Sequence, residues 1–241
     1  MSNIYIKSYL NRLIIGVDMK IADLGCGKSP WLLRNYFRKI WKFGTPLSDA
    51  YCGVPAGTTY FCVEVHRPDF DYISGKLKEF SAQYPDLVMG DIEFICADAR
   101  RSGLQEQSLD AVILSDVVSA PPPRHADLDD YGKPGLTNNS KRQIVDSAID
   151  LLRLDGRLIV ATYQTPVHGA KIFEYLLQTQ RLALLEQHGS PKIHGSLDNY
   201  IYELVFGKTN VRSTARPKIT PLNARQIAQL RRSDLIPMDL A

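Results

Sequence analysis

The sequence predicts an α/β fold with a doubly wound, mostly parallel sheet, and three observations support that prediction. Short apolar runs rich in β-branched residues alternate with segments of helical period from residue 18 to residue 178. These runs are apolar on both faces, as in strands that helices cover on both sides. After residue 179, two strand-like runs follow one another with no helical segment between them, which predicts an antiparallel hairpin at one edge of the sheet.

The same pattern gives the expected elements in order. Five strands are expected before the hairpin, over 19–24, 59–65, 92–97, 111–115 and 157–163. The two hairpin strands are expected over 182–187 and 200–206. Helices are expected over 31–42, 70–83, 139–154 and 167–179, with a short amphipathic helix over 3–15.

The segment 139–154 illustrates how the helices are identified. Its apolar residues fall on one stripe at helical spacing, namely Ile144, Val145, Ala148, Leu151 and Leu152. We expect Asn138 or Asn139 to cap its start and Asp155-Gly156 to end it.

Composition and charge suggest one domain with two appendages. The chain has 241 residues, 44% of them hydrophobic and 23% charged, which is typical of a globular protein with a sizeable core. We expect a short helical segment over 1–17, an α/β domain over 18–207 and a basic tail over 208–241. The tail holds seven basic and two acidic residues, a net charge of +5, so the rest of the chain contributes −2 to the total of +3.

The sequence also predicts the compartment. No apolar run approaches the roughly 18 residues that a membrane helix needs, and the first residues lack the pattern of a secretory signal. The four cysteines, Cys26, Cys52, Cys62 and Cys96, show no CxxC or Cys/His ligand spacing. This pattern disfavours a disulfide scaffold or a structural zinc site and predicts reduced thiols in the cytoplasm.

Two segments interrupt the α/β rhythm. Residues 43–58 contain three glycines and two prolines and form an insertion before the second strand. Residues 120–137 form a longer loop with three consecutive prolines and an acidic cluster. This loop follows the carboxyl end of the fourth strand, where open α/β sheets bind their ligands, so we expect it to be functional.

The most informative stretch is the glycine-rich turn over 20–30. The first strand leads into Gly25-Cys26-Gly27, and Ser29-Pro30 then has the N-cap and N1 arrangement of a helix start. Glycines let the backbone approach a ligand closely, and free N–H groups at a helix start favour an anionic group such as a carboxylate. The third glycine of a GxGxxG dinucleotide fingerprint is replaced by Pro30, which disfavours NAD.

At this turn the sequence resembles the class I S-adenosylmethionine-dependent methyltransferases, whose first motif is similar to Asp23-Leu24-Gly25-Cys26-Gly27. The resemblance covers roughly residues 18–207 and implies a seven-stranded sheet closed by the terminal hairpin. It also implies that S-adenosyl-L-methionine is the cofactor. Asp23, Gly25, Cys26 and Gly27 would then lie at the cofactor, with Cys26 acting through its backbone.

Later motifs follow in the order that this family shows. Glu64 ends the second strand and resembles the carboxylate that accepts hydrogen bonds from both ribose hydroxyls. Asp98 and Ala99 follow the third strand, where the family places an aspartate at the adenine amine. Ser115 and Asp116 end the fourth strand and resemble the residues that the family places beneath the reactive methyl group. Glu64 lies about 40 residues after the turn, against about 20 in nucleotide-binding βαβ units, and the insertion over 43–58 accounts for the excess.

The residue types also suit this chemistry directly. Ribose hydroxyls and an exocyclic amine are donors, so each needs a fixed acceptor, and one carboxylate at each of two successive strand ends supplies them.

Catalytic residues are harder to assign, because alignment of the acceptor with the methyl group supplies much of the acceleration. A base is needed only where the acceptor must lose a proton. Asp116 is the leading candidate for such a base and His125 in the long loop is the second, with Tyr163 and His168 after the fifth strand as weaker alternatives. The run Ser115-Asp116-Val117-Val118 departs from the (Asp/Asn/Ser)-Pro-Pro-aromatic motif of many amino-group methyltransferases, so the acceptor atom stays open.

Two functions from different classes fit the sequence. The first is a methyltransferase whose acceptor is RNA or protein in preference to a small metabolite, because few residues precede the first strand to cap the site and the tail is basic. The second is a catalytically silent scaffold with a methyltransferase-like fold, which binds partners through the tail.

Overall fold

The computed structural model describes residues 18–28, 30–33, 54, 56–86, 89–118, 136–162, 170–189 and 202–208. Within these residues the strands are β1 (Met19–Leu24), β2 (Thr58–Glu64), β3 (Asp91–Cys96), β4 (Leu109–Ser115), β5 (Leu152–Thr162), β6 (Leu182–Gly189) and β7 (Tyr202–Lys208). The α-helices are α3 (Arg67–Gln83), α4 (Asn138–Leu151) and α5 (Ala170–Gln178), and two short 3₁₀ helices are η1 (Trp31–Leu33) and η2 (Ala99–Arg101).

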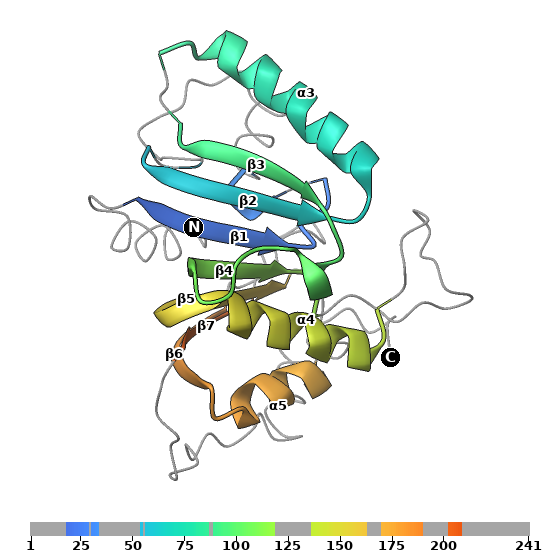
Figure 1. The fold of residues 1–241 in the computed structure, drawn as a ribbon, viewed down its shortest axis with the longest axis vertical. Coiled ribbons are helices and arrows are strands. Elements are labelled where there is room, and N and C mark those ends of the chain that lie inside the picture. The colour runs from blue at the N-terminus through green and yellow to red at the C-terminus, as the bar shows by residue number, and fades with distance from the viewer. Residues whose placement is uncertain are drawn as a thin grey trace.

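The seven strands form one sheet in the order β3-β2-β1-β4-β5-β7-β6 (Figure 1). β1 to β5 are mutually parallel, whereas β7 runs antiparallel to both β5 and β6. This arrangement confirms the predicted parallel sheet with its terminal hairpin, and the observed strand boundaries at β1, β2 and β3 lie within one residue of those expected.

Two cores cover the two faces of the sheet. One contains Ala22 and Val63 and includes the buried faces of α4 and α5. The other contains Ile21 and Cys62 and includes η1 and α3. Because side chains of consecutive strand residues point to opposite faces, this division shows that the sheet is covered on both sides, as in a doubly wound fold.

The ends predicted for α4, which was expected over 139–154, were wrong in two respects. Thr137 caps α4, accepting from Ser140 N at 3.1 Å, whereas we expected Asn138 or Asn139. The helix ends at Leu151, and Asp155-Gly156 lies inside β5.

The Asp-Gly pair instead forms an irregularity in β5. Asp155 has φ +64°, and the register of β5 with β4 shifts in this region. A Cβ at Gly156 would lie 2.9 Å from the Arg153 carbonyl oxygen and 3.1 Å from that of Leu109. The glycine is therefore required by close strand packing and not by a helix terminus.

Several expected features lie outside the described residues. They are the helix over 3–15, the part of the first helix after Leu33, residues 120–135 of the expected loop over 120–137, and the tail after Lys208. Of the described helices, none combines the length and the apolar character that a membrane span requires.

Candidate functional site

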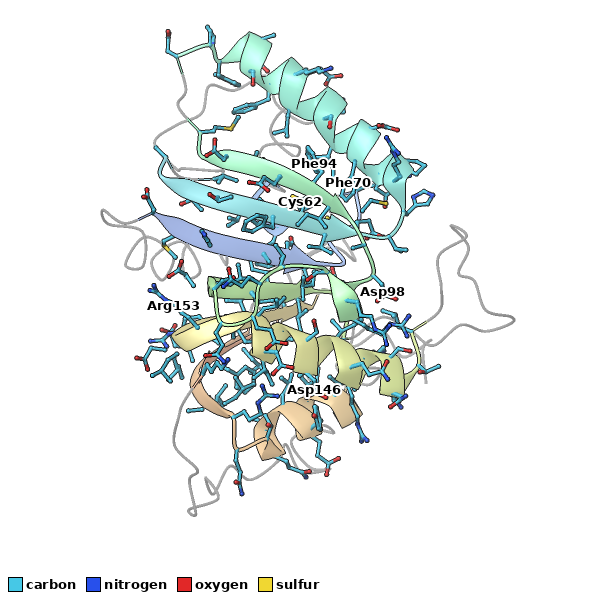
Figure 2. All side chains as sticks on the ribbon, viewed as in Figure 1. Cys62, Phe70, Phe94, Asp98, Asp146 and Arg153 are labelled. Atoms are coloured by element: carbon cyan, nitrogen blue, oxygen red, sulfur yellow. The ribbon has the colours of Figure 1, made fainter. Side chains whose placement is uncertain are left out.

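The carboxyl ends of β1 to β5 meet at one edge of the sheet, and the predicted site residues follow these ends. In Figure 2, Asp98 lies at this edge and Arg153 lies at the opposite, amino-terminal edge. The parallel register places Leu24 beside Val63 and Glu64 beside Cys96. Sheet topology thus brings together acids that are separated by tens of residues in the sequence.

The glycine turn is closed against β2 by its own backbone. Gly25 N and Cys26 N both donate to the Val63 carbonyl oxygen, at 2.8 and 3.2 Å. Gly27 N donates to Glu64 Oε2 at 2.9 Å. Gly25 and Gly27 have φ of +72° and +56°, a conformation that glycine adopts without steric cost.

Gly25 is also required by packing. A Cβ at this position would lie 2.8 Å from Val117 Cγ2, on the segment that follows β4. The turn therefore sits directly against the β4 edge, where Ser115 and Asp116 lie.

Glu64 is buried, with 5% of its surface exposed, and its carboxylate accepts hydrogen bonds from three backbone N–H groups at this edge. Besides the contact with Gly27, Glu64 Oε1 accepts from Val65 N at 2.9 Å and from His66 N at 3.1 Å. The ring of His66 in turn lies 2.9 Å from the buried Asp69 carboxylate at the start of α3. Three backbone N–H donors fix the orientation of this carboxylate at the end of β2.

Asp23 is fully buried and contacts the start of η1. Asp23 Oδ2 accepts from Trp31 N at 2.6 Å and from the Tyr60 hydroxyl at 2.7 Å. Leu32 N donates to the same hydroxyl at 3.3 Å.

These contacts correct one expectation from the sequence. We expected free N–H groups at the helix start to hold an anion, but the N–H groups of Trp31 and Leu32 already have acceptors inside the chain. The same is true of the three N–H groups in the glycine turn. The N–H groups of the turn face β2 and donate to acceptors on that strand.

Asp98 lies at the end of β3 and caps η2. Arg100 N donates to Asp98 Oδ1 at 2.9 Å, and the Arg100 guanidinium contacts both carboxylate oxygens. The hydrogen bonds from the Arg100 side chain lower the pKa of Asp98, so this acceptor is ionised at neutral pH. Ala99 follows as the first residue of η2 and packs against the core on the α4 side.

The end of β4 carries two unusual features. Ser115 is 5% exposed, and within the described part of the chain its Oγ is a buried oxygen with no hydrogen-bond partner. Asp116 has φ +59°, uncommon for a residue with a side chain, and Asp116 N donates to the Ala161 carbonyl oxygen at 2.8 Å. Unsatisfied buried hydroxyls and left-handed backbone are among the features found at ligand sites.

Cys26 contributes its backbone to the turn and its thiol to the core. A hydrogen bond with the Cys62 thiol, together with burial, raises the pKa of Cys26, so the thiol stays neutral. A neutral buried thiol is unreactive, which fits a packing role.

Other predicted residues fall outside the described residues, namely His125, Tyr163 and His168. No group of three His, Cys, Asp or Glu side chains in the described ranges has the arrangement of a metal site. The sequence did not predict a role for Tyr60. The one local indication of such a role is a polar hydroxyl on a buried residue of β2.

The sequence matches no protein-family model, and no curated protein matches it. The protein has the class I methyltransferase fold, with the seven-stranded sheet closed by an antiparallel hairpin. The assignment of this fold rests on the similarity of the chain to solved structures.

An rRNA methylase from Streptococcus thermophilus superposes with a TM-score of 0.51 at 12% identity, covering 87% of this chain and 98% of that one. An N-methyltransferase from Bradyrhizobium japonicum WM9, in complex with S-adenosyl-L-homocysteine, gives a TM-score of 0.52 at 13% identity over 85% and 86% of the two chains. A magnesium protoporphyrin IX methyltransferase from Synechocystis PCC 6803, with S-adenosylmethionine bound, gives 0.51 at 14% over 86% and 78%. At these identities the comparisons establish the fold.

Proposed function

We propose that this protein is an S-adenosyl-L-methionine-dependent methyltransferase. The observation that carries the proposal is the contact between Gly27 N and Glu64 Oε2, because it joins the glycine turn after β1 to the acid that ends β2. Asp98 and the orphan hydroxyl of Ser115 follow at the next strand ends on the same edge. Solved structures of the same fold contain the cofactor or its demethylated product at 13–14% identity.

The described residues fit the cofactor. The ribose hydroxyls would donate to the Glu64 carboxylate, which is buried at the end of β2 and fixed by backbone donors. The adenine amine would donate to Asp98, whose oxygens Arg100 keeps ionised. Ser115 Oγ supplies an unused donor and acceptor at the end of β4.

When bound, S-adenosylmethionine supplies a methyl group on a positively charged sulfur. The part of this chain is to hold that group in line with the acceptor atom, which accounts for much of the rate in such transfers. Asp116, which follows Ser115 and has a left-handed backbone, would accept a proton if the acceptor must lose one. His125 is the alternative base.

The first experiment is calorimetric titration of the full chain with S-adenosylmethionine and S-adenosylhomocysteine. We expect dissociation constants in the micromolar range for both ligands, with one site per chain. A titration with NAD serves as a control and should show no heat of binding. Absence of binding at millimolar ligand would refute the proposal.

Turnover is tested separately, with a radiolabelled methyl group and RNA, protein and metabolite fractions as acceptors. Transfer into one fraction establishes the enzyme. Binding of the cofactor without transfer into any fraction supports the alternative, a silent scaffold.

We further propose that the acceptor is RNA or protein in preference to a small metabolite, with the basic tail as a contact region. The tail's net charge of +5 on an otherwise nearly neutral chain supports this, because lysine and arginine side chains neutralise phosphates and release counterions. The six basic residues after Lys208 are replaced by glutamine in the full chain, and RNA affinity is measured across salt concentrations. Equal affinity and equal salt dependence in both proteins would exclude the tail from RNA binding.

We propose the cytoplasm as the location, because Cys26, Cys62 and Cys96 are free thiols and reducing compartments preserve such thiols. Fractionation of cells that express a tagged full chain tests this.

A further inference from the structure

One hydroxyl joins both ends of the segment that contains the glycine turn. Tyr60 lies in the middle of β2, and its hydroxyl donates to Asp23 Oδ2 at 2.7 Å. The same oxygen of Asp23 accepts from Trp31 N at 2.6 Å, and Tyr60 Oη accepts from Leu32 N at 3.3 Å. Asp23 is the last but one residue of β1 and η1 starts at Trp31, so these contacts connect the start of the segment to its end.

The contacts are buried, and burial makes them strong. Tyr60 and Asp23 have no exposed surface, and Trp31 and Leu32 are at most 9% exposed. Hydrogen bonds to an ionised group in a low-dielectric interior are stronger than neutral ones, and a buried carboxylate that loses a donor is destabilised. Burial and the Asp23 carboxylate both raise the pKa of Tyr60, so the hydroxyl keeps the proton that it donates.

The geometry of β2 explains why Tyr60 and Glu64 act on the same segment. Residues 60, 62 and 64 point to one face of the sheet because side chains alternate along a strand. Glu64 holds Gly27 in the turn, and Tyr60 holds Leu32 just beyond it. Two side chains from one face of one strand therefore fix the turn at two points.

We propose that Tyr60 is a positioning residue for the cofactor, which acts through Asp23 and the Leu32 N–H to hold the glycine turn in its binding conformation. This inference rests on the proposed function, because it assumes that the turn receives S-adenosylmethionine. It also gives Asp23 a defined part. A carboxylate with no exposed surface acts on the cofactor through the backbone of the turn and not by touching it.

The test is Tyr60→Phe, which removes the hydroxyl and keeps the ring. Tyr175→Phe is the matched control, because the Tyr175 hydroxyl also donates to an aspartate, Asp146 Oδ1 at 2.6 Å, between α5 and α4. The dissociation constant for S-adenosylhomocysteine is measured by calorimetry, and the stability of each variant by urea unfolding. The dissociation constants are measured under conditions in which each variant is fully folded, so that lost stability alone does not change the affinity.

We expect Tyr60→Phe to raise the dissociation constant at least tenfold and Tyr175→Phe to leave it unchanged. Wild-type affinity in Tyr60→Phe would overturn the positioning role, and so would an equal loss in both variants. If the wild-type chain itself does not bind the ligand, the proposed function fails first, and this outcome is distinct from the other two.

A second measurement on the wild-type chain avoids any dependence on folding of the variant. Amide hydrogen exchange is followed at Trp31 and Leu32 with and without S-adenosylhomocysteine. We expect the ligand to slow exchange at both amides at least tenfold, because the contacts with Asp23 and Tyr60 must stay closed while it is bound. Unchanged exchange at both amides in a saturated complex would overturn the proposal.

Discussion

Gly27 N lies 2.9 Å from Glu64 Oε2, although the two residues are 37 positions apart in the sequence. This hydrogen bond joins the conformation of a glycine turn to the position of a strand-end carboxylate. A change at either residue should therefore affect ligand affinity and the local fold together, and suitable controls separate the two effects.

Replacing Glu64 by glutamine should weaken cofactor binding. The amide has the shape of the carboxylate but lacks the charge, and one end of it presents N–H groups to backbone donors. We expect a loss of about 1–3 kcal/mol in binding free energy, or roughly a five- to 150-fold higher dissociation constant. Glu79→Gln on α3, where the pair with Lys76 is exposed, is the control and should bind normally. An unchanged constant for Glu64→Gln would remove this residue from the site.

Gly25→Ala should destabilise the protein. The left-handed backbone costs a residue with a Cβ about 1–2 kcal/mol, and overpacking against Val117 adds about 1–3 kcal/mol. In urea unfolding, adding Val117→Ala to Gly25→Ala should recover part of the second cost and none of the first.

The control for that experiment is Gly75→Ala. Gly75 is a helical residue of α3, and no described atom lies within 4 Å of a Cβ built there. Alanine should stabilise this position by about 0.5–1 kcal/mol because it lowers the entropy cost of the helix. Equal effects at Gly25 and Gly75 would contradict our account of the turn.

The Asp98–Arg100 pair predicts a specific pH dependence. The pKa of Asp98 lies below its ordinary value near 3.8, chiefly because the Arg100 side chain hydrogen-bonds to it. The stability that this pair contributes is therefore fully present above pH 3.8 and is lost as the pH falls through the lowered pKa. Arg100→Ala should move the Asp98 titration back toward 3.8, as measured by carboxyl NMR.

Arg101→Ala is the control for the pair, because Arg101 is the last and weakest cause of the shift. Its removal should move the titration less than the removal of Arg100 does. A larger shift in Arg101→Ala would show that general charge, and not the direct hydrogen bond, sets the pKa.

Ser115→Ala should separate folding from binding. Removing a buried hydroxyl without a partner is neutral or stabilising in the free protein. If a cofactor group uses that hydroxyl, the same change raises the dissociation constant for S-adenosylhomocysteine. Thr58→Val removes a second buried orphan hydroxyl, at the amino-terminal end of β2, and should leave affinity unchanged. An unaltered affinity in Ser115→Ala would exclude its hydroxyl from the site.

The sequence by itself determined the order of strands and helices along the chain, and it placed the candidate site residues at strand ends. Apolar runs located the strands β1 to β3 within one residue, because strand burial on two faces depends on local composition. Gly25, Gly27, Glu64 and Asp98 were identified because turn chemistry and strand ends leave local signals. Their placement along one edge followed from the parallel topology.

Only the tertiary structure decided how these residues hold one another. The contact of Tyr60 with Asp23 spans 37 positions and depends on the register of β2 against β1, which no local pattern encodes. The same is true of Gly156, where a side chain is excluded because a Cβ would lie too close to the Leu109 carbonyl oxygen on the neighbouring strand. Periodicity reports which face of an element is buried, whereas hydrogen-bond partners are set by strand register and packing distance, and these exist only once the sheet has formed.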